Sequence, residues 1–313
     1  MPEVSIVIVN MNCPDTLIPC LDSIKAYTKV SYETLVVAYL YTTENLLRIK
    51  EQYPWVTILE SNELRGFSEN NNLALRQAKG KYCFVVNDDT WMDMPVIDKL
   101  ILDFEKLSDG VAAISPKIVF PNGKVQTCGR APWTVGRYLL HYLHLVDETR
   151  PSKWSMKEGL FQTWTLNGAC FMARTYAFRA VGWFDERYTF TPEDIALGHA
   201  FNDAGYSVYA DADVTITHIA NATASRMEGA IKPTRVMGSL LFYCGKNRLK
   251  YALLGSYVWL VEEARVLKYT MLGHDAGRNK LMHDIAKNVQ WAIWSGKGTK
   301  EVFIELYNRV TKV

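Results

Sequence analysis

KYCFVVNDDT, residues Lys81–Thr90, joins an apolar strand to two acidic side chains, Asp88 and Asp89. The apolar run is short and rich in β-branched and aromatic residues, which is typical of a buried strand. SIVIVN, residues Ser5–Asn10, has the same character. Segments with a 3.6-residue apolar period separate these strands and predict helices. Strands that alternate with helices on this scale predict an α/β fold with a doubly wound, mostly parallel sheet. Ligands of such sheets bind beyond the carboxyl ends of the strands, which gives three places here: Asn10–Asn12, Ala38–Tyr39 and Asn87–Thr90.

Length and composition indicate an ordinary globular protein. The chain has 313 residues, 49% hydrophobic and 22% charged, and a formal net charge of +2. This small charge argues against nucleic-acid binding across the whole protein. The six cysteines contain no CxxC pair and several lie in apolar runs, so we expect a reduced, cytoplasmic chain. The N-terminus, MPEVSIVIVN, lacks a basic region and a cleavage site and is predicted to be a strand rather than a signal peptide.

The last quarter of the chain is basic and almost entirely helical in pattern. Residues Ile231–Val313 carry about 14 Lys and Arg against about 6 Asp and Glu. This excess suits an anionic membrane surface or an anionic acceptor, and a solvated basic helical face is an equal alternative. Four aromatic residues among the cations suit peripheral membrane contact, but also packing on the rest of the chain or a homodimer. They are Trp259, Tyr269, Trp291 and Trp294.

The adjacent acids Asp88 and Asp89 are the first candidates for chemistry. Two carboxylates at the end of an apolar strand repel each other unless a cation or hydrogen-bond donors neutralise them. A divalent ion under a diphosphate explains the pair, because Mg²⁺ and Mn²⁺ prefer oxygen ligands and stabilise charge on a leaving phosphate. The alternative is that Asp89 caps the helix that follows.

Two further sites are weaker when taken alone. Glu193 and Asp194 follow Pro192 at the start of a predicted helix, where acidic residues are common for structural reasons. The functional alternative is a general base that takes a proton from an acceptor hydroxyl. His218 ends the predicted strand VTITH. A lone His is more often structural than a ligand, and its role depends on whether the fold brings it near Asp89.

Five blocks of the chain together resemble the family-2 glycosyltransferases, in particular the rhamnosyltransferase-like branch that builds bacterial surface polysaccharides. They are SIVIVNMN with LDSI, ETLVVA, SNELRGFSENNNLAL, FVVNDDT, and the long block Leu166–Tyr206 with the later THIANATAS. The long block is the most specific, because Gly-x-Phe-Asp-Glu, Glu-Asp and Ala-Gly-Tyr at these distances rarely coincide. The resemblance covers about Val4–Ala224.

This resemblance implies a GT-A fold, which is a Rossmann-like, mostly parallel central sheet flanked by helices, with a helical C-terminal region. It implies a catalytic domain over residues 1–230, with a nucleotide-binding half at about 1–110 and an acceptor half at about 111–230. The helical C-terminal region is expected at 231–313.

The resemblance also implies roles for individual residues. Asp89 and His218 would ligate a Mg²⁺ or Mn²⁺ ion. Asp194 would be the catalytic base, and Glu193 would contact the sugar or the acceptor. The residues around the nucleotide sugar would be Asn10, Arg65, Gly66, Phe67, Asn70, Asn71, Asp88, Asn167 and Gly168.

The implied activity is a metal-dependent, inverting transfer of a sugar from a nucleotide-diphosphate donor to a glycan or lipid-linked glycan acceptor. Rhamnose is the candidate sugar by family branch. The expected location is cytoplasmic, with peripheral contact to the inner face of the cell membrane through the C-terminal helices. No nucleic-acid partner is expected.

Two departures from the family pattern keep a rival hypothesis open. Ala38 stands where the family usually has an Asp that binds the nucleotide base, and Ala196 replaces an acid in the usual Glu-Asp-x-Asp-Leu motif. The rival is a non-catalytic sugar-binding or scaffold protein derived from such a transferase. A nucleotidyltransferase is disfavoured, because VNMNCPDT after the first strand contains neither Gly nor Lys.

Overall fold

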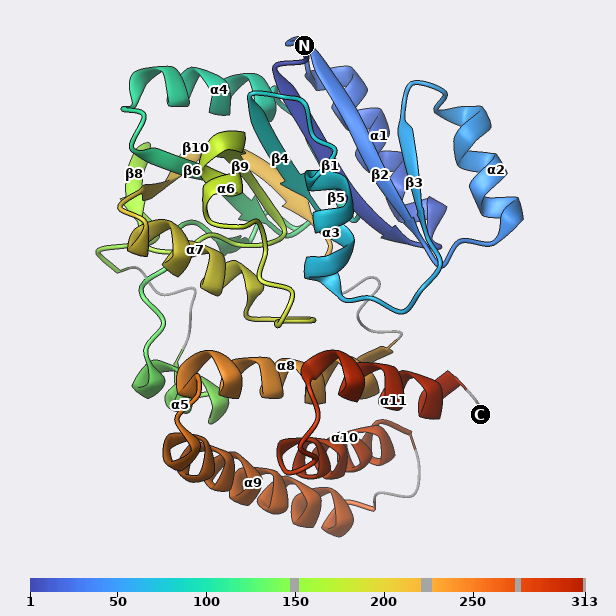
Figure 1. Ribbon diagram of the computed structural model, residues 1–313, viewed down its shortest axis with the longest axis vertical. Helices are drawn as coiled ribbons and strands as arrows, with labels where there is room; N and C mark the ends of the chain where they lie inside the picture. Colours follow the sequence, from blue (N-terminus) through green and yellow to red (C-terminus); the bar gives the residue numbers. More distant parts are fainter. Residues whose placement is uncertain (147–151, 221–226, 274–276, 312–313) are drawn as a thin grey trace. The chain divides into compact units, whose positions relative to one another are not determined.

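The structure, a computed structural model, describes residues 1–146, 152–220, 227–273 and 277–311 (Figure 1). The chain forms two compact units. A sheet unit comprises Met1–Trp133, Val146–Asp185 and Asp194–Ala222, and a helical unit comprises Thr134–Leu145, Glu186–Glu193 and Thr223–Val313. The end of the THIANATAS block, residues 221–225, lies outside the described residues.

The sheet unit alternates strands and helices through its first hundred residues, as the apolar pattern predicts. Its strands are β1 (Val4–Met11), β2 (Tyr32–Tyr39), β3 (Thr57–Ser61), β4 (Tyr82–Val86), β5 (Thr90–Trp91), β6 (Val111–Val119), β7 (Val125–Thr127), β8 (Leu160–Thr163), β9 (Cys170–Arg174) and β10 (Ser207–His218). Its helices are α1 (Pro14–Tyr27), α2 (Thr43–Gln52), α3 (Phe67–Leu75), α4 (Val96–Lys106), α6 (Thr175–Ala180) and α7 (Glu193–Asp203).

One sheet contains all of these strands, in the order β3-β2-β1-β4-β9-β6-β10-β5, with β7 beside β6 and β8 beside β10. The first four strands of this order are parallel. Beyond them the sheet is mixed, because β9 runs antiparallel to both β4 and β6. The carboxyl ends of β1 and β4 therefore meet at one edge, where Asn10 and Asp88 lie.

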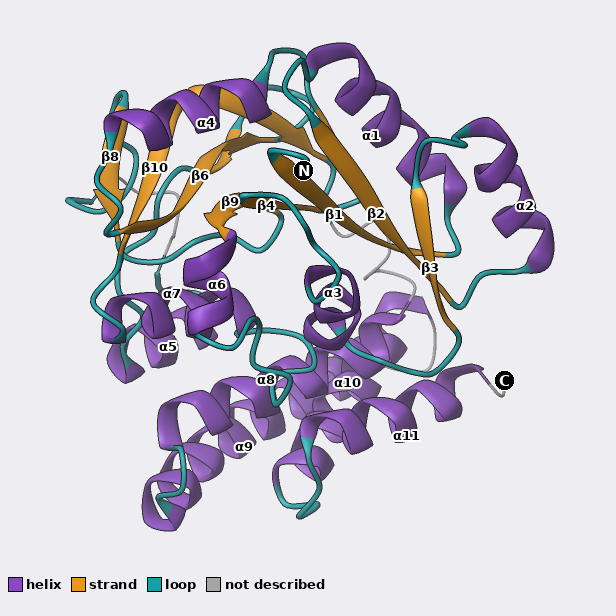
Figure 2. Cartoon of the chain, turned by 45° about the horizontal axis from the view of Figure 1, so that its top comes forward, coloured by secondary structure: helices purple, strands orange, loops and turns teal. Residues whose placement is uncertain are grey.

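Helices cover both faces of the sheet because its strands are apolar on both sides (Figure 2). Ile6 and Ile8 of β1 pack on one face against α1, α2 and α4. Val7 of the same strand points to the opposite face and packs with α3, α6 and α7. In α1, Leu17, Cys20, Leu21 and Ile24 are buried at the spacing of one helical face. This two-sided core fixes the strand ends that carry the candidate site.

The close packing of α7 depends on Gly198. A Cβ atom at this position would lie 2.9 Å from Cα of Thr165, a distance that real Cβ contacts do not reach. The side chain of Asn202, one turn later, donates to the carbonyl oxygen of Trp164 (3.0 Å). Gly198 and Asn202 thereby hold α7 against the segment that precedes β9, and this contact sets the position of Asp194 one turn earlier.

The helical unit is built from α5 (Val135–Tyr142), α8 (Glu228–Cys244), α9 (Arg248–Met271), α10 (Gly277–Ile293) and α11 (Thr299–Thr311). Helix α10 packs on both α8 and α9, and α11 packs on α8. The unit also holds the segment Glu186–Glu193. The Thr299 hydroxyl donates to the carbonyl oxygen of Arg187 (2.7 Å), and the rings of Phe190 and Phe303 are in edge contact. Among the described helices, none is both long and apolar enough to cross a membrane.

Candidate active site at the carboxyl edge of the sheet

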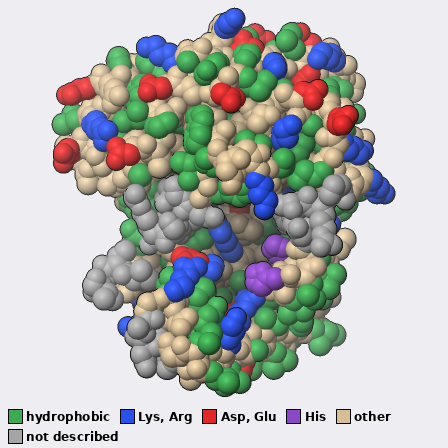
Figure 3. Space-filling view, turned by 180° about the vertical axis from the view of Figure 1, so that it is seen from behind, with side chains coloured by type: hydrophobic (Ala, Val, Ile, Leu, Met, Phe, Trp, Pro, Cys, Tyr) green, Lys and Arg blue, Asp and Glu red, His purple; other side chains and the backbone are tan. Residues whose placement is uncertain are grey.

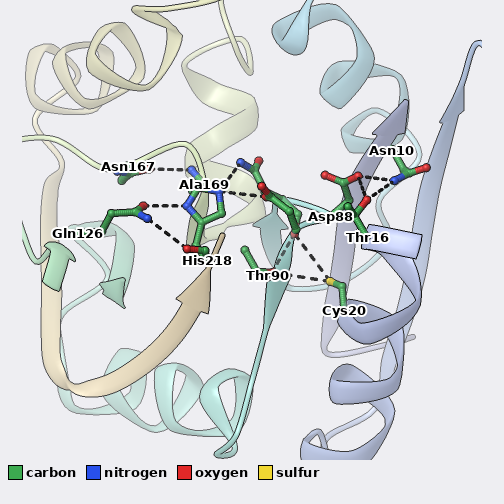
Figure 4. A network of polar contacts seen from close by, with 11 residues as sticks. Asn10, Thr16, Cys20, Asp88, Thr90, Gln126, Asn167, Ala169 and His218 are labelled. Atoms are coloured by element: carbon green, nitrogen blue, oxygen red, sulfur yellow. Dashed lines mark hydrogen bonds and ion pairs between the residues drawn. The ribbon is translucent and has the colours of Figure 1, made fainter. Parts of the chain in front are cut away.

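Asn10 and Asp88 meet where β1 and β4 end side by side. The Asn10 amide donates to the Asp88 carboxylate, and the Thr16 hydroxyl donates to the same oxygen (2.8 Å; Figure 4). Asn10 is itself held, because its side-chain oxygen accepts from the backbone N–H of Cys13 (3.0 Å) and from the Tyr41 hydroxyl. The parallel pairing of the two strands thus brings two residues 78 positions apart into one buried contact.

The Asp88 carboxylate lies in a site that disfavours its negative charge. Burial, followed by the neighbouring charge of Asp89, raises the pKa of Asp88 from 3.8 to about 7. The hydrogen bonds from Thr16 and Asn10 oppose this shift only in part. Asp88 and Asp89 are adjacent and buried. Both carboxylates can be ionised at the same time only if a positive charge lies beside them.

Asp89 and His218 are brought together by the short strand β5. This strand pairs antiparallel with the end of β10, so that Thr90 lies opposite His218. The backbone N–H of Ile219 donates to the carbonyl oxygen of Asp89 (3.0 Å), which closes the pair. Nε2 of His218 then lies 3.0 Å from Oδ1 of Asp89, and both side chains are more than nine-tenths buried.

Gln126 of β7 fixes the orientation of the His218 ring (Figure 4). Its amide nitrogen donates to the carbonyl oxygen of His218 (3.2 Å), so its amide oxygen faces Nδ1 of the ring at 2.8 Å. Nδ1 therefore carries a proton and donates it to Gln126. In the neutral ring the lone pair of Nε2 is then directed at a carboxylate oxygen of Asp89. Two electron-rich atoms 3.0 Å apart require a proton or a metal ion between them.

The chemistry of this pair fits a divalent metal ion. An imidazole nitrogen and a carboxylate oxygen are common metal ligands, and a hydrogen bond from the other ring nitrogen is the usual support for such a His. Over the described ranges, no group of three or more His, Cys, Asp or Glu side chains could hold a metal. The pair therefore supplies two protein ligands at most from these residue types.

Asp194 lies beside the turn that leads into β9. Oδ2 of its carboxylate accepts from Nη1 of Arg130 (2.8 Å) and from the backbone N–H of Gly168 (3.1 Å). Nη1 of Arg130 also donates to the carbonyl oxygen of Leu166 (3.1 Å). Arg130 thus binds both the carboxylate and the turn beside it.

The turn at Asn167–Ala169 connects Asp194 to the first acidic pair. The side-chain oxygen of Asn167 accepts from the backbone N–H of Ala169 (2.9 Å), and the carbonyl oxygen of Ala169 accepts from the N–H of Asn87 (2.9 Å; Figure 4). Asn87 directly precedes Asp88. The predicted residues Asn167, Gly168 and Asp194 therefore share one hydrogen-bonded segment with the end of β4.

The remaining predicted residues have mainly local partners. Asn70 donates to the carbonyl oxygen of Gly66 (3.0 Å), and Asn71 donates to that of Phe67 (2.9 Å), so both buried amides stabilise the first turn of α3. Arg65 forms an ion pair with Glu63 (2.8 Å). Glu193 is buried at the first residue of α7 and belongs to the helical unit.

Ala38 lies beside Asn10 in the register of β1 and β2 and is 1% exposed. The position at which the family usually has an Asp is therefore filled by a buried methyl group. Nearby polar groups are the hydroxyls of Tyr39, which accepts from the N–H of Arg65 (3.1 Å), and of Tyr41, which binds Asn10.

Gln126 and Arg130 were not predicted from the sequence. Gln126 is 92 residues from His218 and Arg130 is 64 residues from Asp194. Both stand in a stretch with no periodic pattern, and neither belongs to a block of the family resemblance. Only the pairing of β7 with β6, and the bridge between Arg130 and Thr165, place them.

Solved structures with the same architecture identify the fold as GT-A. A mannosyltransferase from Pyrobaculum calidifontis, solved with GDP-Man and Mn²⁺, aligns with a TM-score of 0.54 at 15% identity, covering 100% of this chain and 81% of its own. GalNAc-T7, solved with UDP, GalNAc and Mn²⁺, aligns with a TM-score of 0.53 at 15% identity, covering 70% and 44%. At this identity the likeness establishes the fold alone, and it confirms the fold class expected from the sequence.

The family follows from the sequence match. The model of glycosyl transferase family 2 matches residues 5–182, more than half of the chain, and the chain belongs to this family. The family resemblance noted in the sequence is thereby confirmed.

Curated relatives match at modest identity. The O-antigen biosynthesis protein RfbC of Myxococcus xanthus is 30% identical over 248 residues, which is 74% of this chain and 18% of that protein. An N-acetylglucosaminyl-diphospho-decaprenol L-rhamnosyltransferase of Mycobacterium tuberculosis is 26% identical over 205 residues, 55% of this chain and 62% of the relative. The chain thus spans less than two thirds of either relative.

Proposed function

We propose that the protein is a metal-dependent, inverting glycosyltransferase that moves a sugar from a nucleotide-diphosphate donor to a glycan or lipid-linked glycan acceptor in bacterial surface polysaccharide synthesis. Family membership supports the reaction class. Within the structure, the observation that carries the proposal is the contact of Asp89 with the ring nitrogen of His218, held by Gln126. The name of the Mycobacterium tuberculosis relative supports rhamnose and a lipid-linked acceptor as the first substrates to test, and the name of the Myxococcus xanthus relative supports surface polysaccharide synthesis.

Asp89 and His218 would hold the divalent ion, Mg²⁺ or Mn²⁺, with water and donor phosphate oxygens as the remaining ligands. When bound, such an ion offsets the negative charge that develops on the departing diphosphate. Gln126 keeps the proton on Nδ1 of His218 and so keeps Nε2 available as a ligand. The solved GT-A structures that contain Mn²⁺ support the choice of metal.

The donor nucleotide would lie along the carboxyl ends of β1 and β4. Asn10 and Thr16 hold the Asp88 carboxylate in one position, from which it would accept hydrogen bonds from the ribose. The segment from Arg65 to Asn71 would line the base pocket, with Asn70 and Asn71 shaping the backbone rather than contacting the base. With Ala38 in place of a carboxylate, base recognition would rely on backbone groups and other side chains.

Asp194 would act as the base in a single displacement. The acceptor oxygen forms a bond to the anomeric carbon as the bond from that carbon to the donor phosphate breaks, which inverts the anomeric centre. Asp194 takes the proton of the acceptor hydroxyl, and the nucleoside diphosphate leaves. Arg130 and the N–H of Gly168 fix the carboxylate during this step. Asn167 holds the turn beside it and would face the transferred sugar, while Glu193 would contact the sugar or the acceptor.

The decisive experiment measures release of nucleoside diphosphate from a panel of nucleotide sugars, with Mn²⁺, Mg²⁺ or chelator. Turnover of one donor that needs the metal, and that is lost in Asp89→Ala and in Asp194→Asn, is the expected result. Asp109→Asn serves as the matched control, because this carboxylate is 92% exposed and pairs with Arg174 (3.3 Å), which lies opposite the first residue of β4 and not at its carboxyl end. Turnover that is equal with metal and with chelator contradicts the proposed role of the Asp89–His218 pair.

The second candidate is a non-catalytic sugar-binding or scaffold protein. Ala38 favours it, because the base-binding carboxylate of the family is replaced by a buried methyl group. Folded protein that binds a nucleotide sugar in calorimetry, but turns over no member of the panel, would select this candidate over the transferase.

A further inference from the structure

Helix α9 is apolar on two opposite sides, and only one of them is packed. Leu254 and Val258 are buried on the inner side, where α9 packs on α10 and α8. The outer side exposes five large apolar side chains along the whole helix. These are Leu249 (71% exposed), Leu253 (67%), Leu260 (63%), Leu267 (60%) and Met271 (80%).

The five residues form one straight stripe. Helical geometry turns the chain by about 100° per residue, so positions 4, 11, 18 and 22 residues after Leu249 all fall within a sector of about 40°. At about 1.5 Å per residue, the stripe is about 33 Å long. In the sheet unit, by contrast, Leu47 and Leu102 are exposed leucines that lie on different helices, α2 and α4, and form no stripe. Scattered apolar residues are normal on a protein surface, whereas a continuous apolar stripe marks an interaction site.

Exposed cations flank this stripe. Lys250 and Lys268 lie about 100° from Leu249 on one flank, and Arg248 lies about 100° away on the other. Together with Lys246 just before the helix, these cations are exposed, and none of them pairs with a carboxylate within the part of the chain that the structure describes. Figure 3 shows hydrophobic side chains on the surface of the helical unit, in the lower part of the view, with Lys and Arg side chains beside them.

The first turn of α9 contains cations and no acid. The partial positive charge at a helix N-terminus repels cations. Arg248 and Lys250 therefore do not stabilise the helix from this position. One exposed carboxylate lies beside the middle of the stripe: Glu263 is about 40° from Leu249 around the helix and accepts from the amide of Gln290 (2.7 Å). The surface around the apolar stripe is therefore positively charged at both ends.

We propose that this outer face of α9, defined by the five apolar residues and the four flanking cations, docks on an anionic phospholipid membrane with the helix lying in the plane of the interface. Apolar side chains between basic flanks are the pattern of an interfacial helix, which combines burial in the acyl boundary with attraction to anionic headgroups. The docking deepens the proposed function and rests on it for its purpose, because it would bring the enzyme to the surface that contains a lipid-linked acceptor.

Charge favours a lipid surface over a second copy of the chain. If two α9 helices paired along their stripes in antiparallel orientation, Arg248 and Lys250 of one copy would face Lys268 of the other. A parallel pair would place the same cations of both copies together. Either arrangement brings like charges together around an apolar seam, which disfavours the pairing, whereas anionic headgroups would neutralise them.

The test is flotation of the full chain with vesicles of phosphatidylcholine alone or mixed with phosphatidylglycerol. The wild type should float with the anionic vesicles. The triple variant Leu253→Glu, Leu260→Glu, Leu267→Glu should lose at least about 10-fold in vesicle affinity, because both apolar burial and charge attraction are reduced. Leu47→Glu, Leu102→Glu is the matched control, since it changes exposed leucines of the sheet unit (51% and 53% exposed) and should float like the wild type. Lys250→Glu, Lys268→Glu should abolish the preference for anionic vesicles.

Circular dichroism and thermal unfolding verify that each variant is folded. Equal flotation of the wild type and the triple variant would overturn the proposal, as would a wild type that fails to float. A dimer in light scattering that the triple variant converts to a monomer, without vesicle binding by either, would assign the stripe to self-association instead. Flotation does not depend on turnover. A chain that floats but releases no nucleoside diphosphate would contradict the proposed function and still support the docking surface.

Discussion

Asp89 and Asp194 are both largely buried carboxylates that face a basic side chain, but the two partners differ in kind. Asp89 lies 3.0 Å from the imidazole of His218, and Asp194 lies 2.8 Å from the guanidinium of Arg130. A guanidinium stays charged at every pH at which the protein is folded. An imidazole changes its charge near neutral pH, and its neutral form is a metal ligand.

This difference suits the two carboxylates to the two proposed tasks, metal binding for Asp89 and proton transfer for Asp194. The Asp89–His218 contact can exchange a shared proton for a metal ion, because neither partner has a permanent positive charge. The Asp194 carboxylate is already neutralised by Arg130, so it has little power to recruit a metal ion and depends on Arg130 for its position. The proposed metal site and the proposed base would therefore not compete for the same cation.

The largest expected effect is on Asp89. In Asp89→Asn the proposed metal site loses its charged ligand, and the loss of several kcal/mol of charge stabilisation should lower kcat/KM by about 10³- to 10⁴-fold. Calorimetry with a nucleoside diphosphate should show Mn²⁺-dependent binding in the wild type and none in Asp89→Asn. Asp194→Asn is the contrasting variant, because it should keep metal-dependent binding while losing turnover. Equal loss of binding in both variants would contradict the division into two tasks.

The next effect concerns Arg130. Arg130→Met leaves the Asp194 carboxylate, whose side chain is 14% exposed, without its charged partner and frees the turn at Leu166. We expect kcat to fall by about 10²-fold, within the range for a mispositioned general base, with the metal concentration at half-maximal rate unchanged. A double-mutant cycle with Asp194→Asn should show that the two changes are not additive. An increase in turnover would mean that the ion pair restrains the base rather than positions it.

Local signals in the sequence locate the strands and the acids at their ends. The family resemblance adds His218 as a partner of Asp89, but no signal in the sequence indicates Arg130 as the partner of Asp194. Ser5–Asn10 and Lys81–Asn87 are recognisable because a buried parallel strand is continuously apolar. The end of β4 then places Asp88 and Asp89 at the ligand-binding edge by a general rule. His218 needed the fold, because only the antiparallel pairing of β5 and β10 brings it to Asp89.

The roles of Gln126 and Arg130 could not be predicted from the sequence, and the reason is physical. A polar side chain acquires a role from the group it faces, and those groups come from strands far away in the chain. The sequence suggested membrane contact through the C-terminal helices, but it did not indicate which face of α9 is uncovered. A helix with apolar residues on both sides is predicted to be buried. Only the packing of α9 against α8 and α10 shows which of its sides is uncovered.

A smaller effect should follow from Gln126→Leu, which removes the hydrogen bond to Nδ1 of His218. The ring then loses both its orientation and the preference for a proton on Nδ1, so the metal affinity should fall by about 10- to 100-fold. The concentration of Mn²⁺ at half-maximal rate should rise accordingly, and saturating Mn²⁺ should restore most of kcat. Gln162→Leu, at an exposed position of β8, is the control and should leave the Mn²⁺ dependence unchanged. A fall in kcat that Mn²⁺ does not rescue would contradict the positioning role.

The smallest expected effect concerns Asp88, and it is measured as a change in thermal stability rather than in turnover. Since the pKa of Asp88 is raised from 3.8 to about 7, the folded protein binds a proton that the unfolded chain has released across this interval. The contribution of Asp88 to stability is therefore present below pH 3.8 and is lost as the pH rises through 7. Asp88→Asn should remove this loss and raise the unfolding midpoint of the metal-free protein by about 2–4 °C at pH 7, with a smaller gain at pH 5. Mn²⁺ with a nucleoside diphosphate should reverse the order, because the wild type gains a partner for its charge and the variant does not. A variant that is equally stabilised at both pH values would show that its gain has nothing to do with the charge on Asp88.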